Sequence, residues 1–190
     1  MTTESAEKAW TGVELLGTRT RLREFREADG PAAYRIVGDD RVTHFLSFDS
    51  RDMEAAQAMV DGAVQRARSE PRNEYYLAMT RADDDGLIGF CRLALSGVQA
   101  AKLGYAVAAE HWGLGFASDA VSTMLGFGFT TLDLHRITAA IGPDNHASQT
   151  VVSRLGFKQE GILRDHVFTN GAWRDSVLYS ILSHEWTEGR

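Results

Sequence analysis

Hydrophobic and polar residues alternate along several stretches of the chain, and this period of two predicts a set of β-strands. The first predicted strand covers residues 19–25. Six more are predicted between turn residues, over residues 74–80, 87–95, 99–107, 136–141, 159–168 and 172–182. The Asn170-Gly171 pair between the last two strands is typical of a two-residue hairpin turn.

Apolar residues recur at helical spacing in the segments between these strands. Asp29, followed by a Gly-Pro pair, predicts the start of a helix that ends near Val37. Ser50 is predicted to cap a second helix over residues 52–69. A third, amphipathic helix is predicted over residues 117–128, with one buried stripe.

A short fourth helix is predicted to begin at Asn145 as its N-cap and to end at Gly156, with this glycine in the left-handed conformation. The elements then follow the order β-α-α-β-β-β-α-β-α-β-β. This order predicts an α+β (mixed α/β) fold with antiparallel meanders rather than a doubly wound parallel sheet. Residues 1–17 are expected to form an N-terminal lead-in, and residues 18–186 a single domain.

The composition is that of an ordinary globular domain, and it argues against several other classes of protein. Of the 190 residues, 44% are apolar and 24% are charged, and the net charge of −6 argues against nucleic-acid binding. No apolar run approaches the ~20 residues that span a bilayer, and the N-terminus lacks a signal-peptide pattern. We therefore expect a cytoplasmic protein that contacts neither nucleic acid nor membrane.

The cysteine and histidine positions predict neither a disulfide nor a metal site. The single cysteine, Cys91, lies in an apolar run and is expected to be a buried, inert thiol. No group of histidine, cysteine and acidic residues has the spacing of a zinc site, so no metal is expected.

Residues 112–117 form a glycine-containing connection between a predicted strand and a predicted helix. Such a loop can turn its backbone N–H groups toward an anion at the helix N-terminus, although an ordinary connection would show the same pattern. A dinucleotide-binding fingerprint is incomplete, because Ser118 stands at the third glycine and Asp133 precedes a strand instead of ending one. The Gly-Lys-Ser/Thr ending of a Walker A loop is also missing.

Five segments occur in a characteristic order: LGYAV (103–107), HWGLGFASDA (111–120), NHAS (145–148), RLGF (154–157) and EGILRDHVFTNGAWRDSVLYSIL (160–182). Together they resemble the GNAT superfamily of acyl-CoA-dependent N-acyltransferases. The N-terminal TRTRLREFREAD (18–29) fits its ribosomal-protein N-terminal alanine acetyltransferase (RimJ/RimL-type) branch. The resemblance covers about residues 15–186.

The resemblance implies a GNAT fold, in which helices flank a twisted, mostly antiparallel sheet that is splayed between its fourth and fifth strands. The co-substrate implied is acetyl-CoA, whose pantetheine arm would pair with Ala106 and Val107 on the fourth strand. Its pyrophosphate would lie on the loop Trp112, Gly113, Leu114, Gly115, Phe116 and Ala117. Asn145 and Ser148 would contact the pantetheine, and Arg154 either meets a phosphate or ends its helix in solvent.

Two positions of the loop depart from the pattern of the family. Trp112 stands where many relatives have Gln or Arg, and Leu114 stands where many have Lys. The phosphate cradle is therefore expected to use backbone donors with little side-chain charge. A helix N-terminus stabilises a neighbouring anion by only about 0.3–1 kcal/mol.

The reaction implied is the direct attack of a neutral amine on the acetyl thioester. By resemblance, a backbone N–H near Val107 stabilises the oxyanion, and Ser148 protonates the leaving thiolate. The glutamate that acts as base in close relatives falls at Val167. Asp165, two residues away and thus on the same face of the strand, is the candidate substitute, unless it is a structural acid. His44 is expected to line the acceptor pocket.

The absence of this glutamate affects which class of amine can be the acceptor. About 10% of an α-amine is neutral at pH 7, against about 0.04% of a lysine amine. A site without a strong base therefore favours a protein N-terminal α-amine or a small-molecule amine, and the acidic net charge favours a cationic acceptor. The alternative is a non-catalytic module that binds acyl-CoA as a sensor or partner. A homodimer is a further expectation from the resemblance.

Overall fold

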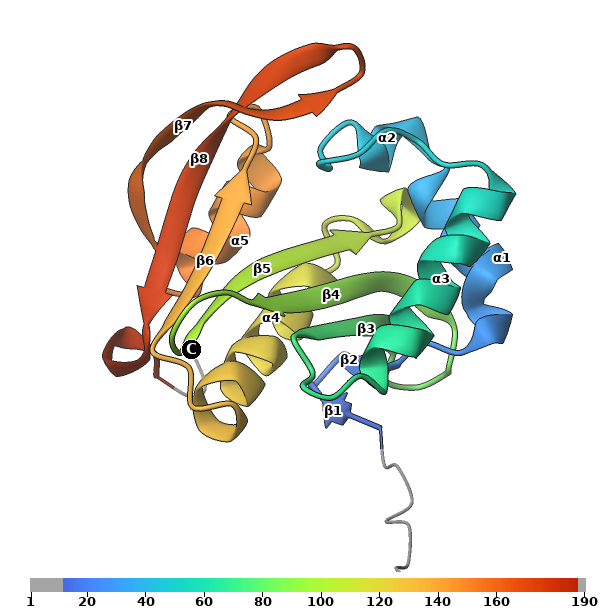
Figure 1. The fold of residues 1–190 in the computed structure, drawn as a ribbon, viewed down its shortest axis with the longest axis horizontal. Coiled ribbons are helices and arrows are strands. Elements are labelled where there is room, and N and C mark those ends of the chain that lie inside the picture. The colour runs from blue at the N-terminus through green and yellow to red at the C-terminus, as the bar shows by residue number, and fades with distance from the viewer. Residues whose placement is uncertain (1–11, 188–190) are drawn as a thin grey trace, which may run out of the picture.

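Eight strands form one sheet that carries helices on both faces (Figure 1). The computed structural model describes residues 12–187. The strands are β1 (Glu14–Leu16), β2 (Thr20–Glu24), β3 (Glu74–Arg81), β4 (Leu87–Leu95), β5 (Ala100–Val107), β6 (Arg136–Ile141), β7 (Lys158–Thr169) and β8 (Ala172–Leu182). They lie in the order β1-β2-β3-β4-β5-β6-β8-β7.

The sheet consists of two antiparallel halves, β1 to β5 and β6-β8-β7, joined where β5 and β6 run parallel. This junction is short, from the pair Ala100 and Arg136 to the pair Lys102 and Thr138. Beyond it the two strands diverge, as Figure 1 shows. The predicted mixed, mostly antiparallel sheet with one splayed junction is confirmed. The strands at the junction are β5 and β6 because β1 precedes the first predicted strand.

Helices cover the two faces of the sheet separately. The α-helices are α1 (Gly30–Val37), α2 (Asp40–Thr43), α3 (Met53–Ala67), α4 (Phe116–Gly126) and α5 (His146–Arg154). Shorter helical segments are η1 (Glu27–Asp29), η2 (Ala109–His111), η3 (Phe127–Thr131, a π-helix) and η4 (Ser183–Glu185). Because side chains alternate along a strand, Leu77 and Met79 pack in the core of α4 and α5, whereas Ala78 packs in that of α1 and α3.

Three of the local signals predicted at turns and helix ends are confirmed. Asn145 caps α5 by accepting a hydrogen bond from the Ser148 amide over 3.1 Å. Gly156 follows the helix with φ +93°, in the left-handed region. Asn170 and Gly171 both have positive φ, at +52° and +73°, as a tight hairpin turn requires.

Three elements differ from the prediction. Strand β1 lies within residues 1–17, where only a lead-in was expected, and the single-turn helix α2 was not predicted. The cap of α3 is Asp52, which accepts from the Ala55 amide over 2.8 Å, and not Ser50. Ser50 bonds instead to Thr43 and Asp40, which ties α2 to the chain that enters α3.

The single cysteine is structural. Cys91 is fully buried on β4, and desolvation raises the pKa of its thiol to about 12, as expected for an inert side chain. Within residues 12–187, no three or more histidine, cysteine or acidic residues are grouped so that they could hold a metal ion. No helix in this part of the chain is both long and apolar enough to cross a bilayer.

Candidate active site

The divergence of β5 and β6 leaves backbone groups of β5 without a strand partner. Neighbouring residues of a strand direct their N–H and C=O groups to opposite sides, and the Ala108 amide donates to Ile88 on β4 over 2.8 Å. By this alternation the backbone N–H and C=O groups of Ala106 also point toward β4, while those of Tyr105 and Val107 point into the gap. The Val107 carbonyl accepts a hydrogen bond from Trp112 Nε1 over 2.8 Å, and its N–H has no partner among residues 12–187.

The loop that follows β5 is shaped by two glycines with positive φ, Gly113 at +75° and Gly115 at +83°. Helix α4 begins directly after Gly115, and no side chain caps it. Its first backbone bond runs from the Asp119 amide to the Gly115 carbonyl over 3.1 Å. The amides of Phe116, Ala117 and Ser118 therefore have no partner within the helix. A Cβ added at Gly113 would meet nothing within 4 Å, so the loop is open and fits an anion.

Asp119, in the first turn of α4, fixes the chain between β1 and β2 against the start of that helix. Its carboxylate accepts five hydrogen bonds, from the amides and hydroxyls of Thr18 and Thr20 and from the Arg19 amide. Desolvation raises the pKa of Asp119, but these hydrogen bonds lower it by more, so the pKa lies below its ordinary value.

Replacing Asp119 by Asn is expected to destabilise the protein by about 1 kcal/mol at pH 7, because the buried Thr20 and its exposed neighbours Thr18 and Arg19 lose a charged acceptor. Since the folded-state pKa is depressed, this contribution is present above the unfolded-state pKa and is lost as the pH falls through the folded one. The difference in Tm between wild type and Asp119→Asn should therefore shrink below about pH 4. Asp83→Asn, in an exposed loop, is the control and should leave Tm unchanged at every pH. A difference that does not change with pH would contradict this role of Asp119.

Helix α5 lies against β5 across the gap. The Tyr105 hydroxyl on β5 donates to the Ser148 carbonyl over 3.3 Å, and burial raises the pKa of Tyr105 to about 12. Ser148 and Asn145 are thus brought to the gap, together with the free N–H of Val107. Arg154 is not, because it is the exposed last residue of α5, roughly 12 Å along the helix axis from its start.

A cavity of about 140 Å³ lies at the outer end of the gap. It is lined by the chain after α2, the chain after β6 and the β7–β8 hairpin: His44, Phe45, Leu46, Ser47, Ala140, Gly142, Pro143, Asp144, Asn145, Val167, Arg174, Asp175 and Ser176. The hairpin reaches over toward α2 in Figure 1. Arg174 holds it there, because its guanidinium donates to the carbonyls of His44 and Leu46 over 2.7 and 3.0 Å.

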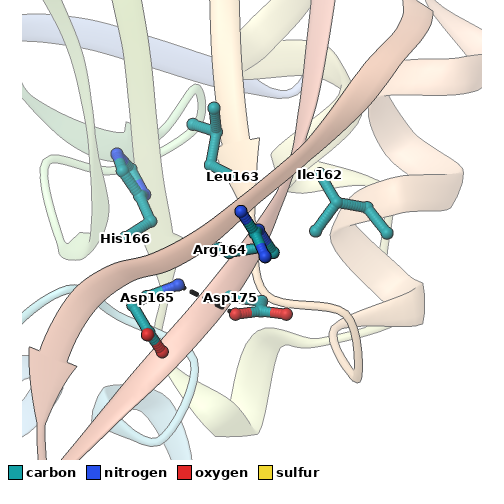
Figure 2. A pocket seen from close by; sticks show the side chains of 6 residues that line it. All are labelled: Ile162, Leu163, Arg164, Asp165, His166 and Asp175. Atoms are coloured by element: carbon teal, nitrogen blue, oxygen red, sulfur yellow. Dashed lines mark hydrogen bonds between the residues drawn. The ribbon is translucent and has the colours of Figure 1, made fainter.

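The structure does not place Asp165 in this cavity. The pairing of β7 with β8 shifts register between Leu163 and Val167, so three residues oppose Asp175 alone. Asp165 has φ +48°, and its amide donates to the Asp175 carboxylate over 2.9 Å (Figure 2). The alternation that would put Asp165 and Val167 on one face is therefore broken, and Asp165 lines a shallow outer depression instead.

Several residues of the site were not identified from the sequence. Asp144 and Asp175 are acids that line the cavity, and Asp175 lies across the hairpin bulge. The Trp112 indole donates a hydrogen bond to the Val107 carbonyl. Its ring also lies edge-on to Phe45, with ring centroids 6.3 Å apart. Trp112 was predicted as part of the loop, but its contact with Phe45 and the place of the two acids depend on the packing of distant segments, which no local pattern indicates. His44, which was predicted, does line the cavity.

Comparisons with known proteins add a family match and structural neighbours. The family described as Acetyltransferase (GNAT) domain matches residues 19–158. The uncharacterized N-acetyltransferase YoaA of Bacillus subtilis (strain 168) is 32% identical over 168 residues, covering 86% of this chain and 93% of YoaA. The ribosomal protein uS5-alanine N-acetyltransferase of Escherichia coli (strain K12) is 31% identical over 119 residues, 61% of either chain. The structure of Mycobacterium smegmatis RimJ in complex with CoA-disulfide has a TM-score of 0.77 at 26% identity, covering 92% of this chain and 88% of that chain.

Proposed function

This chain belongs to the GNAT family of acetyl-CoA-dependent N-acetyltransferases, and from that premise we propose that it acetylates a protein N-terminal α-amine by direct attack in a ternary complex. The observation that carries the proposal is the gap between β5 and β6. It joins an open glycine loop at one end to a small, acid-containing cavity at the other. A thioester and an amine bound at these two ends would meet beside Val107 and Ser148.

The donor end of the gap fits acetyl-CoA. We assign the pyrophosphate to the loop of residues 112–117, where free amides and the positive end of α4 favour a phosphate. The pantetheine arm would lie along β5 as an added strand, bonding to the free backbone groups of Tyr105 and not to those of Ala106, which face β4. Asn145 would contact the arm through its amide nitrogen, because its oxygen already caps α5.

The transfer itself needs an oxyanion donor and a proton for the leaving sulfur. We assign the oxyanion to the Val107 N–H, which faces the gap and is free. The amine nitrogen bonds to the acetyl carbon, the carbon–sulfur bond breaks, and the amine proton passes to water in the cavity. Ser148 donates its hydroxyl proton to the thiolate and is reprotonated by water.

The acceptor end lacks the glutamate that acts as base in related enzymes, and the acids that line it, Asp144 and Asp175, stand at other positions. Val167, where related enzymes have a glutamate, lines the cavity with an aliphatic side chain, and Asp165 lies outside it. An α-amine needs roughly 3 kcal/mol less than a lysine amine to become neutral at pH 7. A site of this kind therefore selects an amine of low pKa.

A peptide with a free N-terminus and no lysine should be acetylated about 250-fold faster at pH 7 than an N-terminally blocked peptide with one lysine, which is the ratio of their neutral fractions. The rate with the first peptide should level off above about pH 8, the pKa of its amine, while the rate with the lysine peptide continues to rise. Acetylation monitored by mass spectrometry measures both. Equal or faster acetylation of lysine would contradict an α-amine acceptor.

Asp144 and Asp175 favour a second acceptor class, a small amine with a further positive charge, because both acids line the cavity. Preferential acetylation of a diamine over both peptides would support it. The non-catalytic alternative, an acyl-CoA sensor, is tested in the same assay. Thiol release from acetyl-CoA that depends on any of these amines would exclude it.

A further inference from the structure

The loop of residues 112–117 lacks a basic side chain of its own, but the fold brings one to it from far along the chain. Arg19, between β1 and β2, donates from Nη1 to the Leu114 carbonyl over 3.2 Å. A Cβ added at Gly115 would have only Arg19 within 4 Å, with Cδ and Nε both at 3.9 Å. The Arg19 side chain therefore lies along the loop, beside the first residues of α4.

The position of Arg19 is fixed by the same residue that begins α4. The Arg19 amide donates to Asp119 over 3.1 Å, and the residues on either side, Thr18 and Thr20, donate to the same carboxylate. Asp119 thus holds the backbone of Arg19 at the N-terminus of the helix, about 100 residues away in sequence. Its own charge is taken up by five donors.

The guanidinium itself is left with unused donors. Arg19 is exposed, and no acidic residue among residues 12–187 forms an ion pair with it. One hydrogen bond to a carbonyl uses a single donor of the five that a guanidinium carries. Two side chains of the loop, Trp112 and Leu114, are exposed and apolar, at 45% and 51%. Within residues 12–187, a guanidinium without an acidic side-chain partner therefore lies beside the first amides of α4.

We propose that Arg19 binds the pyrophosphate of CoA together with those amides, in place of the basic side chain that relatives carry at the position of Leu114. The inference rests on the proposed function, because it assigns a residue to the same CoA site. A guanidinium and a phosphate form short, charge-assisted hydrogen bonds that a lysine ammonium makes with less geometric definition. Arg19 acts here in binding and not in the chemical step.

The test compares CoA with 3′-dephospho-CoA, which keeps the pyrophosphate and lacks the phosphate on the ribose. Titration calorimetry should show that Arg19→Ala binds both ligands about tenfold more weakly than wild type, the scale of one charged hydrogen bond. The loss should shrink at high salt, which screens an exposed charge, and Arg19→Lys should recover part of it. Arg35→Ala, which removes an exposed charge from α1 on the opposite face, is the matched control and should bind both ligands normally.

The outcomes separate this inference from the proposed function. Unchanged affinity of Arg19→Ala for both ligands would overturn the role of Arg19, and so would a loss that does not depend on salt. A loss confined to CoA would overturn the assignment to the pyrophosphate, because only the ribose phosphate would then be involved. Failure of the wild-type protein to bind CoA would instead contradict the proposed function. Matching Tm values of wild type and variant would show that the fold is intact.

Discussion

Gly115→Asp should bind CoA at least 100-fold more weakly than wild type, in a protein that still folds. Gly115 has φ +83°, which costs an L-residue about 1–2 kcal/mol, with Asp among the residues that tolerate it best. The added Cβ would meet only Arg19, at 3.9 Å, so there is no steric clash. The new carboxylate would stand at the place assigned to the pyrophosphate and would repel it. Titration calorimetry with CoA measures the loss directly.

Gly97→Asp separates this effect from backbone strain. Gly97 lies in the turn between β4 and β5 with φ +74°, and a Cβ there would meet nothing within 4 Å. The same substitution therefore introduces the same strain and the same charge at a distance from the loop. Both variants should lose similar stability, but Gly97→Asp should bind CoA like the wild type. Normal CoA binding by Gly115→Asp would show that the loop is only a connection.

Those parts of the fold that depend on local periodicity could be predicted from the sequence. The strands over residues 87–95, 136–141 and 172–182 were predicted to the residue, because each is long enough to show alternation and is bounded by turn residues. Strand β1 has only three residues, and it depends on its pairing with β2. Helix α2 is a single turn, too short for helical spacing to be recognised.

The candidate site, like the fold, has parts that the local sequence could predict and parts that it could not. Positive φ at Gly113 and Gly115 is a local property of a glycine loop, so its shape could be predicted. Arg19 and the loop are about 95 residues apart, and nothing near either one indicates that they meet. The error at Asp165 has a related cause. A bulge arises from how β7 pairs with β8, and it changed the face on which a correctly predicted strand places its side chain.

Ser148→Ala should lower kcat about 100-fold, the contribution of a positioned general acid, while leaving the affinity for CoA unchanged. Ser148 stands in the first turn of α5, where its amide is capped by Asn145 and its carbonyl accepts from Tyr105. Both bonds use backbone atoms, so the substitution removes only the hydroxyl. Alanine also has the higher helix propensity, so α5 should persist. A steady-state assay of thiol release gives kcat, and calorimetry gives the affinity.

Ser153→Ala makes the same substitution in the same helix at an exposed position and should keep normal kcat. Tyr105→Phe tests whether Tyr105, and not Ser148, donates the proton to the thiolate. The tyrosine proton is already engaged with the Ser148 carbonyl, so its removal should affect the packing of α5 more than kcat. If Tyr105→Phe lost 100-fold in kcat and Ser148→Ala did not, the tyrosine would be the proton donor. Ser148→Thr, which keeps a hydroxyl, should retain more activity than Ser148→Ala because the proton on that hydroxyl is what the thiolate requires.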